Sequence, residues 1–103
     1  EKEWNRGLSY QKTLGENGGM LFIFPDYQVR SFWMKDMNFP LDIIWIKDDK
    51  IVKISANLAP EGNQPKNIYS SDEPVNYVLE VNAGFCGKNK IKIGEQIQYF
   101  LNP

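Results

Sequence analysis

The sequence predicts a mainly β domain: a small antiparallel sheet, closed or folded into a barrel, with one or two short helices. Two Ile-rich runs with two aspartates between them form an evident hairpin, and other short apolar runs recur between turn residues. Strands do not alternate with long helical segments and no internal repeat occurs, which argues against a parallel sheet or a repeat fold. The 103 residues are enough for one core and one domain.

The N-terminal segment predicts little regular structure. Trp4 and Leu8, four residues apart, favour a short helix that breaks near Gly7. Three glycines and an asparagine in residues 15–19 indicate a loop, and no Gly-Lys-Ser/Thr sequence follows that would make it a phosphate loop.

The next segment predicts two strands. A continuous apolar block at residues 20–24 is typical of a buried strand, and we expect Pro25 and Asp26 to end it in a turn. Residues 30–35 are short and aromatic and predict a second strand. Residues 36–40 then form a connection.

The central hairpin consists of residues 41–47 and 50–58, joined by Asp48 and Asp49 as a two-residue turn. Both runs are rich in isoleucine and other apolar residues, as buried strands are.

The C-terminal part alternates loops and short elements. Residues 59–66 predict a loop, which the polar stretch up to Pro74 extends. Residues 77–81 predict a strand, residues 83–90 a helical turn, and residues 91–101 a turn followed by a last strand.

Composition excludes several classes of function. Twelve basic and thirteen acidic residues are scattered along the chain and give a net charge of −1, so we expect no nucleic-acid partner. Histidine is absent, which excludes Ser-His-Asp and Cys-His catalysis and zinc sites built on imidazole. No run of 18 apolar residues occurs, so no membrane-spanning segment is expected. We expect no cofactor and no metal.

Three groups of motifs, read in order over nearly the whole chain, resemble domain-of-unknown-function family 192. The motifs are RGL at residues 6–8 with GMLFIFP at 19–25, RSFWMK at 30–35 with PLD at 40–42, and YVLEVNAG at 77–84 with IGE at 93–95. The resemblance implies a compact β-rich fold and little about activity. Members often carry a signal peptide or lipoprotein leader, which implies an extracytoplasmic location, whether secreted, periplasmic or lipid-anchored.

The start of the chain departs from that family pattern. Members generally have a strand before the Arg-Gly-Leu motif, and this chain begins with Glu1 rather than Met. We therefore expect a leader, and a first strand, to be missing; without that strand a sheet edge is left open.

Aromatic residues are candidate ligand contacts. Trp33, with Phe32 and Tyr27 near it in sequence and Trp4 and Trp45 elsewhere, has the flat face that stacks on a sugar ring. Core packing is the alternative for each of them.

Charged residues in or beside apolar runs are the second set of candidates. Lys35, Asp42 and Glu80 either form a structural salt bridge, with Glu80 alternatively facing water, or the two carboxylates act as acid and base on a glycosidic bond. Arg6 and Arg30 are the only guanidinium groups, and each either clamps a carboxylate or ties down a loop carbonyl.

Three further residue types have mainly structural interpretations. Asn82 suits a turn or a helix cap, although we include it among candidate ligand contacts. Cys86 lies near a predicted helix start, and without histidine or a second cysteine we interpret it as a small buried hydrophobe. The three methionines fill apolar space rather than bind copper.

These observations favour a non-catalytic binding or accessory domain of the cell envelope or exterior, with a polysaccharide or another envelope component as its ligand. An enzyme that uses Asp42 and Glu80 is the first alternative. A domain that binds another protein through an open sheet edge is the second.

Overall fold

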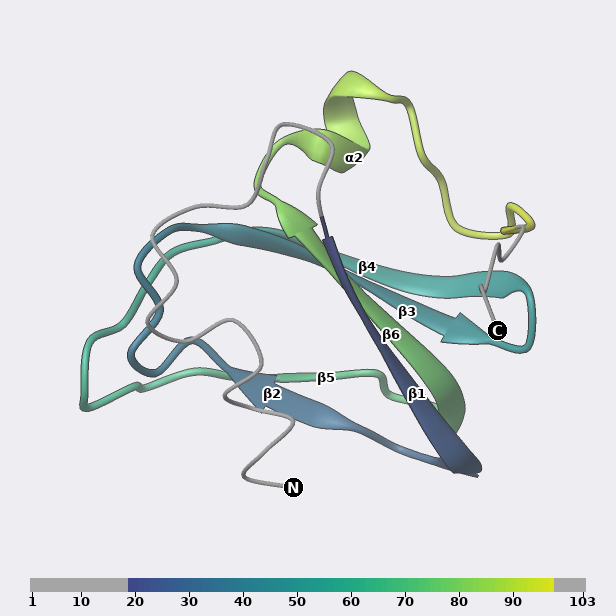
Figure 1. Ribbon diagram of the computed structural model, residues 1–103, viewed down its shortest axis with the longest axis horizontal. Coiled ribbons are helices and arrows are strands. Elements are labelled where there is room, and N and C mark those ends of the chain that lie inside the picture. The colour runs from purple at the N-terminus through teal and green to yellow at the C-terminus, as the bar shows by residue number, and fades with distance from the viewer. Residues whose placement is uncertain (1–18, 98–103) are drawn as a thin grey trace.

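The computed structural model describes residues 19–97, which fold into two antiparallel sheets and one short helix (Figure 1). The main sheet has the strand order β1-β6-β3-β4 and the second sheet pairs β2 with β5. The mainly β prediction is confirmed. The second sheet folds over one face of the main sheet, and within residues 19–97 the two do not close into a barrel.

The predicted hairpin is confirmed as β3 (Leu41–Lys47) and β4 (Lys50–Leu58), with Asp48 and Asp49 as the turn. Asp48 takes a positive φ of 58°, a conformation that Asp tolerates in tight turns. Leu41 pairs with Leu58 but Ile43 with Ser55, so β4 has one extra residue there and bulges around Asn57.

β1 (Gly19–Gln28) is longer than the sequence predicts. The expected end at Pro25 is wrong: the strand continues, but its pairing with β6 is irregular between Ile23 and Gln28. Pro25 has no N–H to donate to the ladder, and a bulged edge strand is where a sheet tolerates proline.

The predicted second strand is β2 (Ser31–Trp33), shorter than expected at both ends. Its partner β5 (Ile68–Ser70) lies within the stretch predicted as loop, and that part of the loop prediction is wrong. β6 (Val75–Asn82) is confirmed and extends the predicted strand at both ends.

The predicted helical turn is α2 (Phe85–Lys88). Of the predicted last strand, residues 96 and 97 are described: Gln96 forms an isolated bridge to Lys50, Ile97 is not in a strand, and residues 98–101 lie outside the described residues. The helix expected near Trp4 also lies outside them. Within the part of the chain that is described, no helix is long and apolar enough to cross a bilayer.

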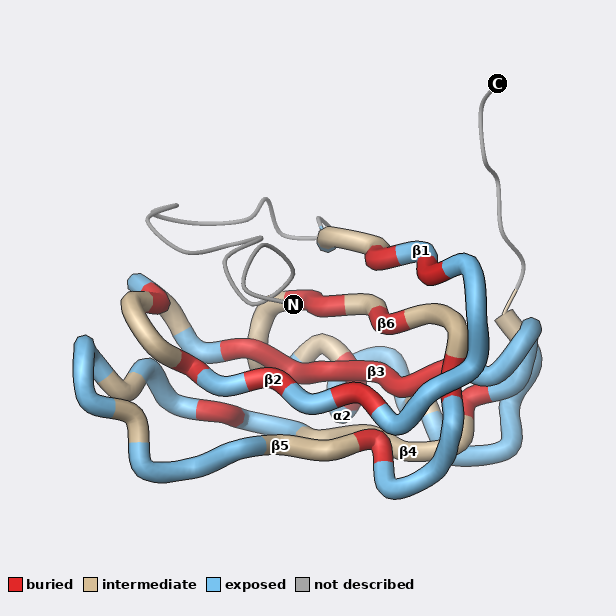
Figure 2. Tube along the Cα trace, turned by 90° about the horizontal axis from the view of Figure 1, so that it is seen from below, coloured by how far each residue is buried: buried red, intermediate tan, exposed pale blue. Residues whose placement is uncertain are grey.

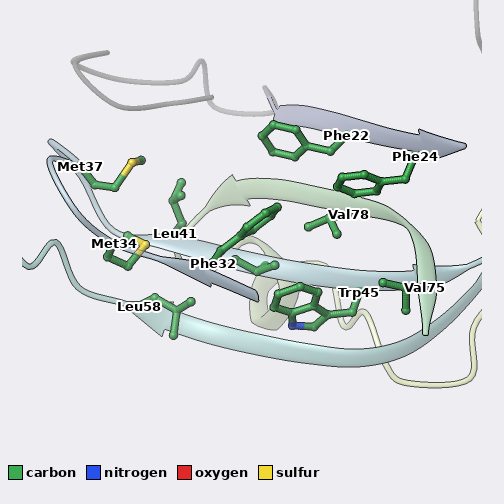
Figure 3. Close-up of a cluster of buried hydrophobic side chains, with 11 residues drawn as sticks. Phe22, Phe24, Phe32, Met34, Met37, Leu41, Trp45, Leu58, Val75 and Val78 are labelled. Atoms are coloured by element: carbon green, nitrogen blue, oxygen red, sulfur yellow. The ribbon is translucent and has the colours of Figure 1, made fainter. Parts of the chain in front are cut away.

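The main sheet is apolar on both faces. One face packs against β2 and β5, and its core, the inner core, is formed by Phe22, Phe24, Phe32, Met34, Met37, Leu41, Ile43, Trp45, Leu58, Val75 and Val78 (Figure 3). The other face packs against α2 and the segment after it, around Ile44, Ile46, Ile51, Val81 and Cys86. β2 and β5 therefore lie on one side of the main sheet, and α2 lies on the other.

Candidate functional site

The outer surface of the β2–β5 sheet carries an exposed aromatic side chain. Trp33 on β2 lies directly opposite Ile68 on β5, and Ser31 lies opposite Ser70. Trp33 is 36% exposed and Ile68 is 68% exposed. We call the surface formed by these residues, Ser31, Trp33, Ile68 and Ser70, the Trp33 face.

Strand alternation determines which aromatic residue of β2 faces solvent. Neighbouring residues of a strand point to opposite faces, so Phe32 and Trp33 diverge. Phe32 points into the inner core, where its ring centroid lies 5.4 Å from that of Phe22 and 5.7 Å from that of Trp45 (Figure 3). The exposure pattern along β2, with buried Phe32 between exposed neighbours, is visible in Figure 2. Phe32 thus anchors the strand while Trp33 stays accessible.

Lys35 borders the Trp33 face. Its Nζ lies 5.5 Å from the centroid of the Trp33 ring, within cation–π range. The turn that follows β2 is held by the backbone, because Glu61 N donates to Met34 O at 3.1 Å and Asp36 N donates to Gly62 O at 2.8 Å.

Glu61 organises the loop between β4 and β5. Its Oε1 accepts hydrogen bonds from the backbone N–H groups of Lys66 and Asn67 at 2.7 and 3.2 Å, and its Oε2 accepts from Tyr69 Oη at 3.3 Å. These bonds hold the pKa of Glu61 below its usual value. They fix the chain that leads into Ile68.

The other aromatic candidates do not join this face. Trp45 is fully buried, and its Nε1 donates to Ser55 Oγ at 3.0 Å. Tyr27 is exposed, but its hydroxyl donates to Asp48 Oδ1 at the tip of the β3–β4 hairpin. Trp4 lies outside the described residues.

Arg30 has the structural role that the sequence analysis offered as an alternative. Its Nη2 donates to both the carbonyl oxygen and Oδ1 of Asp26 at 2.7 Å, and its Nε donates to Val75 O at 3.3 Å. The guanidinium carbon lies 3.9 Å from the centroid of the Phe24 ring. Arg30 therefore ties the irregular end of β1 to β6. Arg6, the other candidate guanidinium, lies outside the described residues.

Asp42 is fully buried at the start of β3. Its Oδ1 accepts from the backbone N–H groups of Asn57 at 2.8 Å and Gly84 at 3.3 Å, and its Oδ2 accepts from that of Cys86 at 3.0 Å. One carboxylate therefore links the β4 bulge to the first turn of α2. Gly84 has φ +91°, a conformation that glycine adopts without strain.

Glu80 is buried on β6, directly opposite Met20 on β1 and Ile43 on β3. Its carboxyl group has no hydrogen-bond or ion-pair partner among residues 19–97. Burial alone raises the pKa of its carboxyl group to about 8, because the charged form loses its hydration. Asn82, two residues further along β6, is half-buried opposite Leu41.

The register of β3 and β6 separates the two candidate carboxylates. Asp42 pairs with Val81, and Glu80 pairs with the next β3 residue, Ile43. Because neighbouring positions point to opposite faces, Asp42 faces α2 and Glu80 faces the inner core. The two carboxyl groups do not form a catalytic pair, and neither joins the Trp33 face.

The cysteine and methionines have the apolar roles predicted for them. Cys86 is buried, and burial together with the nearby Asp42 carboxylate raises the pKa of its thiol to about 12, so the reactive thiolate is disfavoured. Met34 and Met37 fill the inner core. Across residues 19–97, no three His, Cys, Asp or Glu side chains are grouped so that they could hold a metal ion.

The fold and the Trp33 face define a small two-sheet antiparallel β domain with an exposed aromatic residue on its minor sheet. The chain belongs to the family DUF192, described as Uncharacterized ACR, whose model matches residues 1–99. The predicted family resemblance is thereby confirmed. A comparison with curated proteins found no match.

Two solved structures resemble this fold, each with a TM-score of 0.84. One is a proposed transcription regulator from Sinorhizobium meliloti 1021, 34% identical, where the match covers 92% of this chain and 72% of that one. The other is a protein of unknown function from Novosphingobium aromaticivorans DSM 12444, 31% identical, with 96% and 69% covered.

The structure brings together only part of what the sequence analysis selected. Trp33 and Lys35 lie side by side, whereas Asp42, Glu80 and Arg30 are buried at separate places. Ile68 was missed, because the polar residues before it indicated a loop. The strand preference of Ile68 and Tyr69 was the available signal, and two residues are too few to make it distinct.

Proposed function

We propose that this protein is a non-catalytic binding domain that contacts a polysaccharide through the Trp33 face. The observation that carries the proposal is the exposed indole of Trp33 on a rigid strand, with exposed Ile68 opposite it. When a ligand covers an apolar aromatic surface, that surface leaves water and the free energy of the system falls. Aromatic faces also pack well against flat ring surfaces.

The surroundings of Trp33 support this role. Packing of Phe32 in the inner core fixes β2, so little conformational entropy is lost when a ligand covers the neighbouring side chain. The hydroxyl of Ser31 and the ammonium group of Lys35 lie at the border of the face, where they supply polar contacts to sugar hydroxyl groups. We further propose an extracytoplasmic location, because the family resemblance implies export.

The first test is affinity electrophoresis and calorimetry of the full chain and its Trp33→Ala variant against a panel of plant and bacterial polysaccharides. We expect saturable binding of at least one polymer, weakened roughly fivefold or more in the variant, since a central aromatic anchor typically supplies more than about 1 kcal/mol of binding energy. Tyr27→Ala is the matched control, because it removes another exposed aromatic side chain away from the face.

Unfolding curves of both variants will separate a lost contact from a lost fold. The proposal is wrong if no polymer binds, or if Tyr27→Ala weakens binding as much as Trp33→Ala does.

A further inference from the structure

The end of α2 and the segment after it expose three lysines within five residues. Lys88 ends the helix, and Lys90 and Lys92 follow it, all of them exposed. We call residues 88–93 the basic loop. It lies on the side of the main sheet away from β2 and β5, so it is remote from the Trp33 face (Figure 1).

The backbone of the basic loop is held in place. Lys90 N donates to Gly87 O at 3.2 Å, and Ile91 N donates to Cys86 O at 2.9 Å. After the loop, Gly94 N donates to Ile51 O at 2.8 Å on β4. Lys90 takes a positive φ of 55°, which turns the chain sharply between these anchors. The lysines are therefore presented on a fixed turn.

The two isoleucines of this segment have different surroundings. Ile91 packs against the core that faces α2, whereas Ile93 is 63% exposed. An exposed isoleucine beside lysines combines an apolar group with positive charge, which is the combination that interfacial membrane anchors use.

The segment itself carries a positive charge, and one acidic side chain borders its end, where Asp49 Oδ2 accepts from Gln96 Nε2 at 3.4 Å. No acidic residue occurs between Glu80 and Glu95, while three lysines do. The Glu95 carboxylate lies at the end of the loop, where its Oε1 accepts from Lys92 N at 2.6 Å. With Glu95 included, residues 81–95 still have a net charge of +2, from three lysines and one glutamate.

We propose that the basic loop is a peripheral docking surface for an anionic lipid bilayer. Charge complementarity supplies the attraction, and Ile93 enters the headgroup region, where its side chain leaves water. Exposed Ile93 favours a bilayer over a nucleic acid, because a phosphate backbone gains nothing from an aliphatic side chain. Lysines, which act as point charges, suit the diffuse charge of a lipid surface.

The experiment is co-sedimentation of the full chain with vesicles of phosphatidylcholine alone, or of phosphatidylcholine mixed with phosphatidylglycerol. We expect binding only to the mixed vesicles, at millimolar lipid, and weakening as salt is added. The double variant K90Q/K92Q should lower the partition coefficient roughly 25-fold, the product of about fivefold for each lysine. Ile93→Ser should lower it severalfold at every salt concentration.

The matched control is K47Q/K66Q, which neutralises two exposed lysines elsewhere. Both double variants change the net charge from −1 to −3. A difference in vesicle binding between them is therefore due to the position of the lysines and not to the total charge. Equal loss in the two double variants, equal binding to both vesicle types, or binding to duplex DNA with none to vesicles would each overturn the proposal.

Discussion

Glu80 places an ionisable carboxyl group where the fold provides apolar neighbours. On β6 it faces the inner core, opposite Met20 on β1 and Ile43 on β3. Neither neighbour carries a charge or a hydrogen-bond donor in its side chain, so the neutral carboxyl is the form that the interior accepts. The pKa of about 8 means that Glu80 is largely protonated in the folded protein at neutral pH.

This burial predicts that stability falls as pH rises. The unfolded chain loses the Glu80 proton near its ordinary pKa of 4.5, while the folded chain keeps it up to about 8. Between these values the folded state binds more protons, so the stabilisation is full below pH 4.5 and is lost progressively towards pH 8. The loss is on the order of 5 kcal/mol for a pKa raised from 4.5 to about 8. Urea unfolding of wild type and Glu80→Gln at pH 5, 6, 7 and 8 will measure it.

The Glu80→Gln variant should be nearly insensitive to pH over this range, because its side chain does not titrate. Glu61→Gln is the control. Hydrogen bonds lower the pKa of Glu61, so its contribution to stability changes with pH only below its ordinary pKa. The variant should therefore show the same fall of stability between pH 5 and 8 as the wild type. A wild-type stability that stays flat from pH 5 to 8 would contradict the prediction.

At the scale of elements, Asp42 joins three segments that sequence distance separates. Its carboxylate accepts from the β4 bulge at Asn57 and from Gly84 and Cys86 at the start of α2. The helix has four residues and its N-cap is Gly84, which has no side chain to accept from the first N–H groups, so its start depends on this distant carboxylate.

Removal of that carboxylate should release α2 and weaken the fold. For Asp42→Ala we expect a loss of about 3 kcal/mol in the free energy of unfolding, because three backbone N–H groups lose their acceptor. Amide hydrogen exchange should accelerate most at Asn57 and Cys86. Asp42→Asn, which keeps one acceptor oxygen, should lose clearly less; equal losses in the two variants would show that the hydrogen bonds are not the cause.

The elements that the sequence predicted well are those whose partners are near in sequence. Leu41–Lys47 and Lys50–Leu58 pair across a two-residue turn, so local pattern and turn chemistry define them together. β5 forms because it pairs with β2, which lies more than 30 residues earlier in the chain. The residues around β5 do not show that partner, so the local sequence does not predict the strand. β1 continues past Pro25 because Arg30 binds Asp26 and Val75 O, a tertiary interaction that overrides the local turn signal.

At the scale of the whole molecule, strand register determines which candidate residues lie close to one another. The sequence identified Trp33, Asp42 and Glu80 as unusual, and the structure gives each a reason for its position. Which of them share a face depends on strand pairing: a shift of one residue between β3 and β6 would put Asp42 and Glu80 on the same face of the sheet. Residue type predicted the candidates, and topology determined their grouping.

The two proposed surfaces lie on opposite sides of the main sheet, and this arrangement predicts that they act independently. The Trp33 face belongs to the sheet that packs on the inner core, and the basic loop follows the helix that packs on the other core. Substitutions at sites that share no contacts usually have additive effects, so Trp33→Ala should keep full vesicle binding and K90Q/K92Q should keep full polysaccharide binding.

The wild-type protein should then hold both ligands at once and sediment a soluble polysaccharide together with anionic vesicles. Trp33→Ala should abolish this bridging because it weakens polysaccharide binding, and K90Q/K92Q because it weakens vesicle binding. If K90Q/K92Q weakened polysaccharide binding as strongly as Trp33→Ala, the two surfaces would form one site, and the domain would recognise an acidic polymer rather than link a polymer to a membrane.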